Sequence, residues 1–230
     1  MTSDLFDSAF PPDPRTFAGA ISLRLASGAV SVDEVIEEFS EIAGDVESPF
    51  LDDEPIDPID VPGIVAAVAA EYRRCVMFTS ADARALINAL DRLADARILY
   101  VYGEGRDVAE SLEAVTGMAE AVAENGVELR GALYSTLQDL ERMIMDGRLV
   151  IRMDDRTGAD DGALIEDVVA LLNSLGLTAG WTPPERRIVV DPIHFRAPLV
   201  TDEETPSDAG PPVPDPAVAA PTPLAQDEQQ

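Results

Sequence analysis

Helical and strand-like hydrophobic patterns alternate along most of this chain, and this alternation constrains the fold more than any other feature. Ser31 and Glu34 have the spacing of a capping box, and Asp107 with Glu110 begins another helix in a similar way. The run 98–102 is β-branched and aromatic and is closed by glycine, which is typical of a strand. The chain is therefore expected to build a sheet covered by helices.

The expected elements define the fold class. Ile87 in one helix, and Val108 and Met118 in the next, belong to apolar stripes that we expect to face the core. Helices that alternate with strands predict an α/β or α+β fold, in which a mixed sheet of about four to six strands packs against helices. In chain order we expect helices over 16–26, 32–43, from 62 to between 73 and 78, from a cap at Thr79 to before 97, and over 107–125, 137–145 and 164–175, with strands over 98–102, 127–135, 148–153, 177–181 and 187–190.

Two acidic, proline-rich stretches divide the chain. Residues 45–61 contain Pro49, Pro55 and Pro58 among carboxylates, which indicates a linker. Residues 201–230 hold seven prolines and seven acidic residues but no basic or aromatic residue, so they cannot bury enough apolar surface to fold. The expected organisation is a flexible N-terminus over 1–15, N-terminal helices over 16–44, the linker over 45–61, an α/β domain over 62–200 and a disordered tail over 201–230.

The charge of the chain limits its partners. All 16 basic residues are arginine, and 44 acidic residues give a formal net charge of −28. A surface this negative repels phosphate backbones and anionic lipid headgroups, so we expect no direct binding to nucleic acid or to a membrane. A basic protein remains the expected class of partner.

The sequence also predicts a cytoplasmic location. No apolar run approaches the roughly 18 to 20 residues that a membrane span requires. Asp4 and Asp7 stand where a secretory signal would carry basic residues. The single cysteine, Cys75, excludes an intramolecular disulfide, in agreement with a reducing compartment.

Three segments resemble a known family. ALYSTLQDLERMIMDGRLVIRM is followed by ALIEDVVALLNSLGLTAGWTPPERRIVVDPIHF, and SVDEVIEEFSE lies near the start. Over most of residues 17–199 they resemble an uncharacterised actinobacterial family catalogued only as a domain of unknown function. The resemblance implies a strand, a short helix ending in glycine, a strand, a long helix and a closing hairpin with a tryptophan. Family members carry a cysteine-rich stretch that GEGRDVAESLEAV replaces here, so no metal or redox role carries over.

Two positions could in principle support catalysis or nucleotide binding. Gly103-Glu104-Gly105 lies between a strand and a helix, as in a phosphate-binding turn, but the third glycine of the dinucleotide fingerprint is absent. We therefore favour an ordinary βα turn. His194 is the only histidine, and no acid or nucleophile is placed beside it by spacing. We expect it to be half-buried at the end of the last strand.

Three further candidates have a structural and a functional interpretation. Cys75 follows Arg73 and Arg74, which could lower the pKa of its thiol, but a buried, inert thiol is favoured. The loop 154–162 could gather aspartates around Mg²⁺ or Ca²⁺, although its spacing fits no known calcium loop and a solvated loop is favoured. Trp181 could anchor a partner, and the favoured alternative is that it covers the end of the core. The aspartates of the loop are Asp154, Asp155, Asp160 and Asp161.

These observations favour a non-enzymatic interaction or regulatory module with a strongly acidic surface. We expect no catalytic residue, no cofactor and no metal ligand, with Trp181 as a possible partner contact. One alternative is a metal- or nucleotide-dependent enzyme that uses carboxylates. Another is that the charge only aids solvation, as in salt-adapted proteins.

Overall fold

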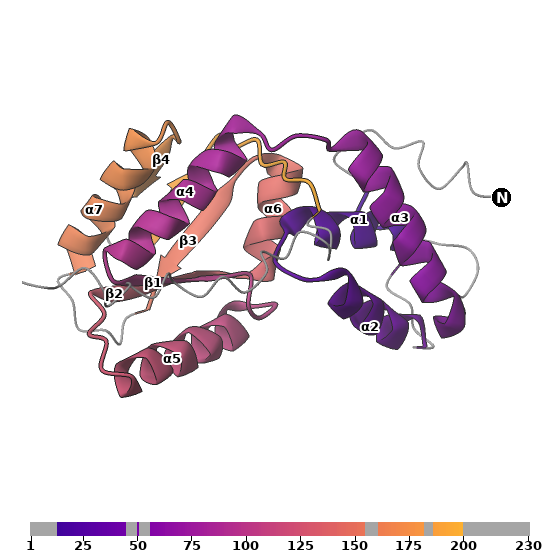
Figure 1. The fold of residues 1–230 in the computed structure, drawn as a ribbon, viewed down its shortest axis with the longest axis horizontal. Coiled ribbons are helices and arrows are strands. Elements are labelled where there is room, and N and C mark those ends of the chain that lie inside the picture. The colour runs from indigo at the N-terminus through magenta and orange to yellow at the C-terminus, as the bar shows by residue number, and fades with distance from the viewer. Residues whose placement is uncertain (1–12, 45–49, 51–55, 155–160, 182–185, 200–230) are drawn as a thin grey trace, which may run out of the picture. The chain divides into compact units, whose positions relative to one another are not determined.

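The computed structural model of the chain describes residues 13–44, 50, 56–154, 161–181 and 186–199. Residues 1–12, most of the expected linker and the expected tail over 201–230 lie outside this part. None of the helices in the described part combines the length and apolar character that a bilayer crossing requires. The elements, shown in Figure 1, are α1 (Phe17–Ser27), α2 (Val32–Ala43), the 3-10 helix η1 (Pro58–Asp60), α3 (Val61–Cys75), α4 (Ala81–Asp95), β1 (Ile98–Tyr102), α5 (Val108–Glu124), β2 (Gly131–Ser135), α6 (Leu137–Asp146), β3 (Leu149–Met153), α7 (Asp161–Ser174), β4 (Ala179–Trp181) and β5 (Arg187–Val190).

The five strands form one mixed sheet in the order β1-β2-β3-β5-β4. β1 and β2 run parallel, with Ile98 beside Gly131 and Tyr102 beside Ser135. All other neighbouring strands are antiparallel. The one parallel pair needs a crossover connection, which α5 supplies. The expected mixed sheet packed against helices is confirmed, as an α+β fold.

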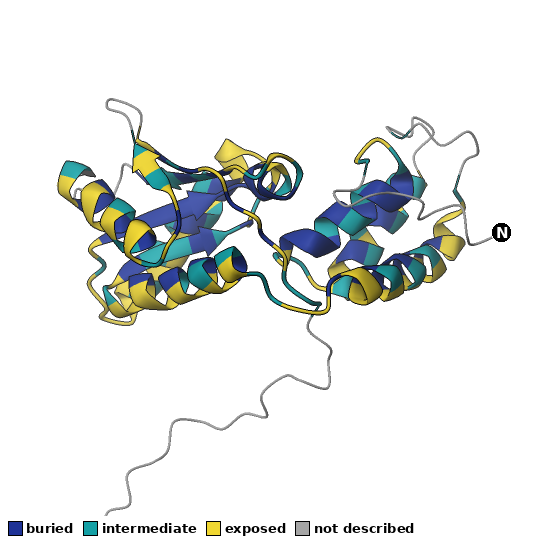
Figure 2. Cartoon of the chain, turned by 90° about the horizontal axis from the view of Figure 1, so that it is seen from above, coloured by how far each residue is buried: buried dark blue, intermediate teal, exposed yellow. Residues whose placement is uncertain are grey.

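The two faces of the sheet are covered to different extents. Helices α4, α6 and α7 contribute to the main core, which includes Leu86, Leu140 and Leu172. On the other face α5 packs over β1 and β2, where Val115 meets Val101 and Ala132. Figure 2 shows the buried strands enclosed by helices with exposed outer sides. Ser111 and Val115 are the buried residues of α5, so most of the surface of this helix is open to solvent.

The N-terminal helices have a core of their own. Phe17 packs edge-on against Phe39 and Phe50, with ring centroids 5.3 and 5.2 Å apart. α3, which the sequence assigned to the α/β part, contacts α1 and α2 and contributes Val65 and Val68 to this core. The last turn of α3 joins the main core instead. All these elements belong to one compact unit that ends at Leu199.

Several predicted element starts were wrong by one to four residues, among them those of α4, β2, α7 and β4, which begins at Ala179 rather than at residue 177. The side chain that caps α4 is Ser80, not Thr79, since its Oγ accepts a hydrogen bond from the N–H of Ala83 at 3.1 Å. β2 begins at Gly131, because the chain first turns at Gly126, where φ is 78°. α7 begins at Asp161, three residues before the first apolar residue of its stripe.

The predicted apolar stripes of α4 and α5 were partly wrong. Ile87, Val108 and Met118 are exposed. In α4 the small residues Ala83 and Ala89 are buried with the leucines instead, because they allow the helix to approach the sheet closely.

Candidate functional site

The turn between β1 and α5 is an ordinary βα turn whose N–H groups bond carboxylates of the same chain. Gly103 and Gly105 have positive φ values of 75° and 79°. Asp107 accepts hydrogen bonds from the N–H groups of Ala109 and Glu110 at 2.8 and 3.0 Å. The N–H of Arg106 donates to the Glu110 carboxylate at 2.7 Å. Donors that a phosphate would need are therefore already bonded to negative groups.

A buried polar cluster lies at the end of β2, where α6 begins. Thr136 and Asp139 form a capping box, in which Asp139 Oδ2 accepts from the N–H and the hydroxyl of Thr136 at 3.1 and 2.8 Å. The guanidinium of Arg152 on β3 forms an ion pair with the same oxygen. Asp139 Oδ1 is buried and has no hydrogen-bond partner among the described residues.

Tyr100 completes this buried cluster. Its hydroxyl lies 2.7 Å from the Oγ of Ser135, which also donates to the carbonyl of Val150 at 2.6 Å. Burial raises the pKa of Tyr100 well above its usual range, so the phenol stays protonated. The sequence analysis missed this cluster, although the Thr136 to Asp139 spacing is that of a capping box. Most polar groups of the cluster bond one another, and Asp139 Oδ1 is the exception.

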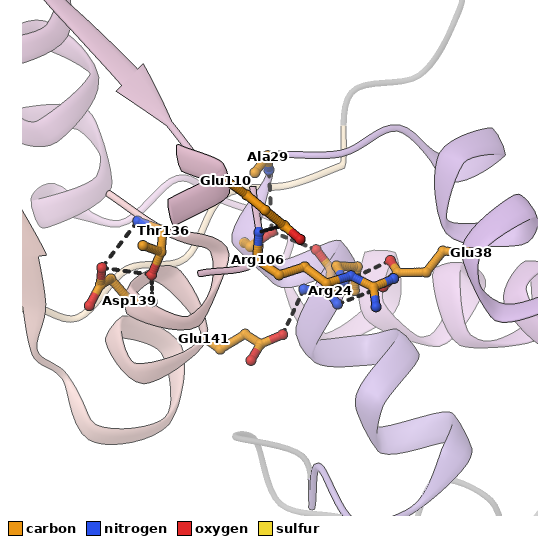
Figure 3. A network of polar contacts seen from close by, with 9 residues as sticks. Arg24, Ala29, Glu38, Arg106, Glu110, Thr136, Asp139 and Glu141 are labelled. Atoms are coloured by element: carbon orange, nitrogen blue, oxygen red, sulfur yellow. Dashed lines mark hydrogen bonds and ion pairs between the residues drawn. The ribbon is translucent and has the colours of Figure 1, made fainter. Parts of the chain in front are cut away.

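An ion-pair network joins the N-terminal helices to α6 and to the loop between β1 and α5. Arg24 of α1 binds Glu38 of α2 through two hydrogen bonds of 3.0 and 2.8 Å, and Glu141 of α6 at 2.7 Å. Arg106 binds the same Glu38 at 2.9 Å. Figure 3 shows Arg24 between the two carboxylates. Burial raises the pKa of Glu141, and Arg24 lowers it in part.

These contacts cover the carboxyl ends of β1 and β2. The Tyr102 hydroxyl donates to the carbonyl of Ser27 at 3.0 Å. A Cβ added at Gly103 would lie 2.6 Å from side-chain atoms of Ala29 and Leu140, so the packing here is close. Ligands of open α/β sheets bind at this kind of edge. In this protein its own N-terminal helices occupy that position.

His194 and Cys75 differ from what the sequence predicted. His194 is exposed rather than half-buried, and it lies four residues beyond β5, where its N–H donates to Asp82 at 2.7 Å. Cys75 is exposed rather than buried, with its sulfur 3.6 Å from Glu71 Oε1. It ends α3, and the adjacent Val76 turns into the core in its place. His194 and Cys75 thus contact different carboxylates, Asp82 and Glu71.

The acidic loop and the tryptophan complete the sequence candidates. Asp154 is buried, and its N–H donates to the carbonyl of Ala132 at 2.9 Å. Asp155 and Asp160 lie outside the described residues, and Asp161 begins α7. Within the described residues no three His, Cys, Asp or Glu side chains gather as metal ligands would. Trp181 is partly buried and packs against the main core at the end of β4, as a core-covering residue does.

The solvent side of α5 is a second feature that the sequence analysis missed. Positions 113, 117, 120 and 124 follow one another along one side of the helix. Glu113, Gly117, Glu120 and Glu124 are all exposed, and we call them the α5 acidic face. The same side contains a shallow hollow of about 460 Å³, lined by Ala109, Leu112, Glu113, Thr116, Gly117 and Glu120.

In the described part of the chain, the two arginines that flank α5 bind carboxylates outside this face. Arg106, just before α5, binds Glu38 at 2.9 Å. Arg130, which follows the helix, binds Asp167 at 2.7 Å. Across the described residues, Glu113, Glu120 and Glu124 take part in no ion pair. The α5 acidic face thus presents negative charge to solvent that no ion pair among residues 13–44, 50, 56–154, 161–181 and 186–199 compensates.

Comparison with known proteins gives a family and no activity. No curated protein and no solved structure matches this chain. One family model matches residues 13–199, a range that contains every helix and strand of the fold. The resemblance noted from the sequence is confirmed at the level of the family, and an actinobacterial origin stays a prediction. The chain belongs to the family described as "Domain of unknown function (DUF6891)".

Proposed function

We propose that this chain is a cytoplasmic, non-enzymatic interaction module whose α5 acidic face binds a positively charged segment of a partner protein. The observation that carries the proposal is the uncompensated charge of this face. Glu120 and Glu124 are four residues apart on the helix, where two like charges repel each other. Glu124 also lies at the end of α5, where the helix dipole disfavours an anion. A cationic segment would relieve both effects.

Gly117 supports close approach of such a segment. A glycine inside a helix costs about 1 kcal/mol relative to alanine. Packing within this chain does not explain the glycine, since an added Cβ would meet no atom within 4 Å. The missing side chain leaves room for the backbone of a partner between Glu113 and Glu120. The adjoining hollow extends this room along the helix.

The test is binding of a defined probe to the full chain. The probe is a fluorescent 20-residue peptide of arginine, alanine and leucine, and its affinity is measured by anisotropy at low and high salt. The variant Glu113→Gln, Glu120→Gln, Glu124→Gln removes the charge of the face. The matched control Asp33→Asn, Glu37→Gln, Glu41→Gln removes three exposed carboxylates from α2. Both variants change the formal net charge from −28 to −25.

The two variants are expected to behave differently. Loss of the α5 charges should weaken binding about tenfold or more, since three exposed ion pairs of about 0.5 kcal/mol each amount to roughly that factor. Loss of the α2 charges should change the affinity by less than about twofold. Equal weakening by the two variants would mean that the peptide responds to net charge alone, and the proposal would then be wrong.

A further inference from the structure

The backbone of α5 is already hydrogen-bonded along its length. In the interior of a helix each N–H bonds to the carbonyl four residues before it, so the middle of α5 has none left for a partner. Asp107 accepts from the first N–H groups. At the other end the N–H of Gly126 donates to the carbonyl of Ala123 at 2.9 Å, and that of Val127 to Val122 at 3.3 Å. An extended segment would therefore gain no main-chain hydrogen bonds from the middle of α5, whereas a helical segment satisfies its own backbone groups.

The α5 acidic face also has the spacing of a surface that packs against another helix. Its positions 113, 117, 120 and 124 are separated by four, three and four residues, which is the interval at which one helix contacts a second along its length. Glu113 and Glu120 are seven residues apart, about 10.5 Å along the axis at the helical rise. Residues seven apart on a second helix have the same separation and lie on one side of it, so both can carry cations to this pair.

The hollow beside Gly117 suits an apolar side chain of such a helix. Leu112 in its lining is partly buried and packs against the cluster between α5 and the sheet. The hydroxyl of Thr116, also in the lining, donates to the carbonyl of Leu112 at 2.6 Å, so it needs no hydrogen bond from an occupant. Since Gly117 has no side chain, the backbone of a second helix can approach α5 here, and a leucine of that helix can enter the hollow.

The charge of this region determines which polar residues the second helix carries. From residue 97 to residue 130 the chain holds seven acidic residues and three arginines. None of these arginines lies within α5. Arg106 and Arg130 already form ion pairs with carboxylates outside the helix. The region therefore keeps an excess of negative charge, which attracts a helix with arginine or lysine and repels an acidic one.

We propose that the partner segment of the α5 acidic face is an amphipathic α-helix that packs along α5. It places an apolar side chain in the hollow and cations seven residues apart against Glu113 and Glu120. This inference rests on the proposed function, because it names the form and the residue pattern of the segment that the face binds. In this arrangement the apolar lining of the hollow is buried, while the main-chain groups of both helices keep their hydrogen bonds.

Two fluorescent peptides of identical sequence test the proposal in anisotropy titrations of the full chain. Both contain arginines seven residues apart with a leucine between them on the same helical side, in an alanine background. The second peptide has D-residues at four interior positions, which break the helix but keep the charge and the composition. On the protein, Gly117→Leu fills the space over α5. Gly63→Leu in α3 is the matched control, because an added Cβ meets no atom within 4 Å at either glycine.

The helical peptide should bind at least about tenfold more tightly than the D-residue peptide, because its side chains are aligned before binding. Gly117→Leu should weaken binding of the helical peptide about tenfold, while Gly63→Leu leaves it within about twofold, since only the first substitution blocks close approach. Neither variant should lower the unfolding temperature, because leucine has the higher helix propensity.

The results separate this inference from the proposed function. Equal affinities of the two peptides, both weakened by Glu113→Gln, Glu120→Gln, Glu124→Gln, would overturn the helical form and leave the proposed function intact. Binding of the helical peptide that is unchanged in Gly117→Leu would also overturn the packing along α5. If neither peptide responds to the three glutamine substitutions, the proposed function fails, and this inference fails with it.

Discussion

Replacing Arg24 by methionine should destabilise the fold strongly, because Arg24 is the cation shared by two partly buried carboxylates. Its side chain is 11% exposed, and those of Glu38 and Glu141 are 16% and 31% exposed. Methionine has similar length and keeps the packing of the aliphatic stem, but it offers no charge. The substitution therefore leaves Glu141 without its cation, and leaves Glu38 with Arg106 alone.

The size of the effect follows from this burial. Removing one partner of a buried ion pair costs roughly 3–5 kcal/mol. Both carboxylates keep some contact with water, and Arg106 remains beside Glu38, so we expect about 3 kcal/mol, the lower end of that range. For a protein of this size, about 2–4 °C per kcal/mol gives a decrease of about 6–12 °C in the unfolding temperature.

The pH dependence has a definite sign. Burial raises the pKa of Glu141 above its usual 4.5 in the folded state, so the folded state holds this proton more tightly than the unfolded state. Stability is therefore lost as the pH rises from about 4.5 through the folded pKa. Without Arg24, which lowers this pKa, the loss grows. The variant should be closer to the natural protein at pH 5 than at pH 7.

Urea unfolding at both pH values measures the effect. Arg92→Met is the control, because Arg92 is exposed and its Nε donates to Asn88 at 3.0 Å. Adding Glu38→Gln and Glu141→Gln to Arg24→Met should recover most of the loss, since both carboxylates that Arg24 neutralised are then replaced by neutral amides. A cost for Arg24→Met below about 1 kcal/mol, typical of surface ion pairs, would refute the reasoning. So would a triple variant no more stable than Arg24→Met.

Three further substitutions test the packing. Gly117→Ala should raise the free energy of unfolding by about 1 kcal/mol, since alanine has the higher helix propensity and the new Cβ would meet no atom within 4 Å. A lower free energy of unfolding in chemical denaturation would contradict this. Gly103→Ala should lower the free energy of unfolding by about 1–3 kcal/mol or more, because φ is 75° and the new Cβ would lie 2.6 Å from side-chain atoms of Ala29 and Leu140. An unchanged denaturation midpoint would contradict this, because it would mean that the turn relaxes without loss of stability. Ser80→Ala should lower the free energy of unfolding by about 1–2 kcal/mol, because it removes the cap of α4. Amide hydrogen exchange should become faster in residues 193–197, because the Ser80 hydroxyl forms hydrogen bonds with His194 and Arg196. Exchange rates equal to those of the natural protein would contradict this role of Ser80.

Local rules predicted many of the elements of this fold. The capping box of Ser31 and Glu34 and the cap at Asp107 are present where the spacing indicated them. The strand over 98–102 and the glycine end of α6 at Gly147 are also confirmed. In each case the residues that decide the structure lie within four positions of one another. Such interactions can be read from the chain without knowledge of its tertiary contacts.

Tertiary contacts decided what the sequence could not. Helical spacing finds an apolar stripe on α5, but this helix covers only β1 and β2, so Val115 is buried while Met118 stays exposed. Arg24 and Glu141 are separated by 117 positions, and no local pattern links them. The α5 acidic face depends on the same contacts, because its charge is uncompensated only once Arg106 and Arg130 are seen to bind elsewhere.

Mapping the arginine-rich peptide onto the chain by NMR tests the central claim most directly. If the peptide binds the α5 acidic face, the largest amide chemical-shift changes in a titration of the isotope-labelled protein should lie between residues 110 and 124, with Gly117 among them. Amides of α2 near Glu37 should stay unchanged, although that helix also exposes carboxylates. Shift changes spread equally over α2 and α5 would show that the peptide follows net charge, and would contradict the assignment of a docking face to α5.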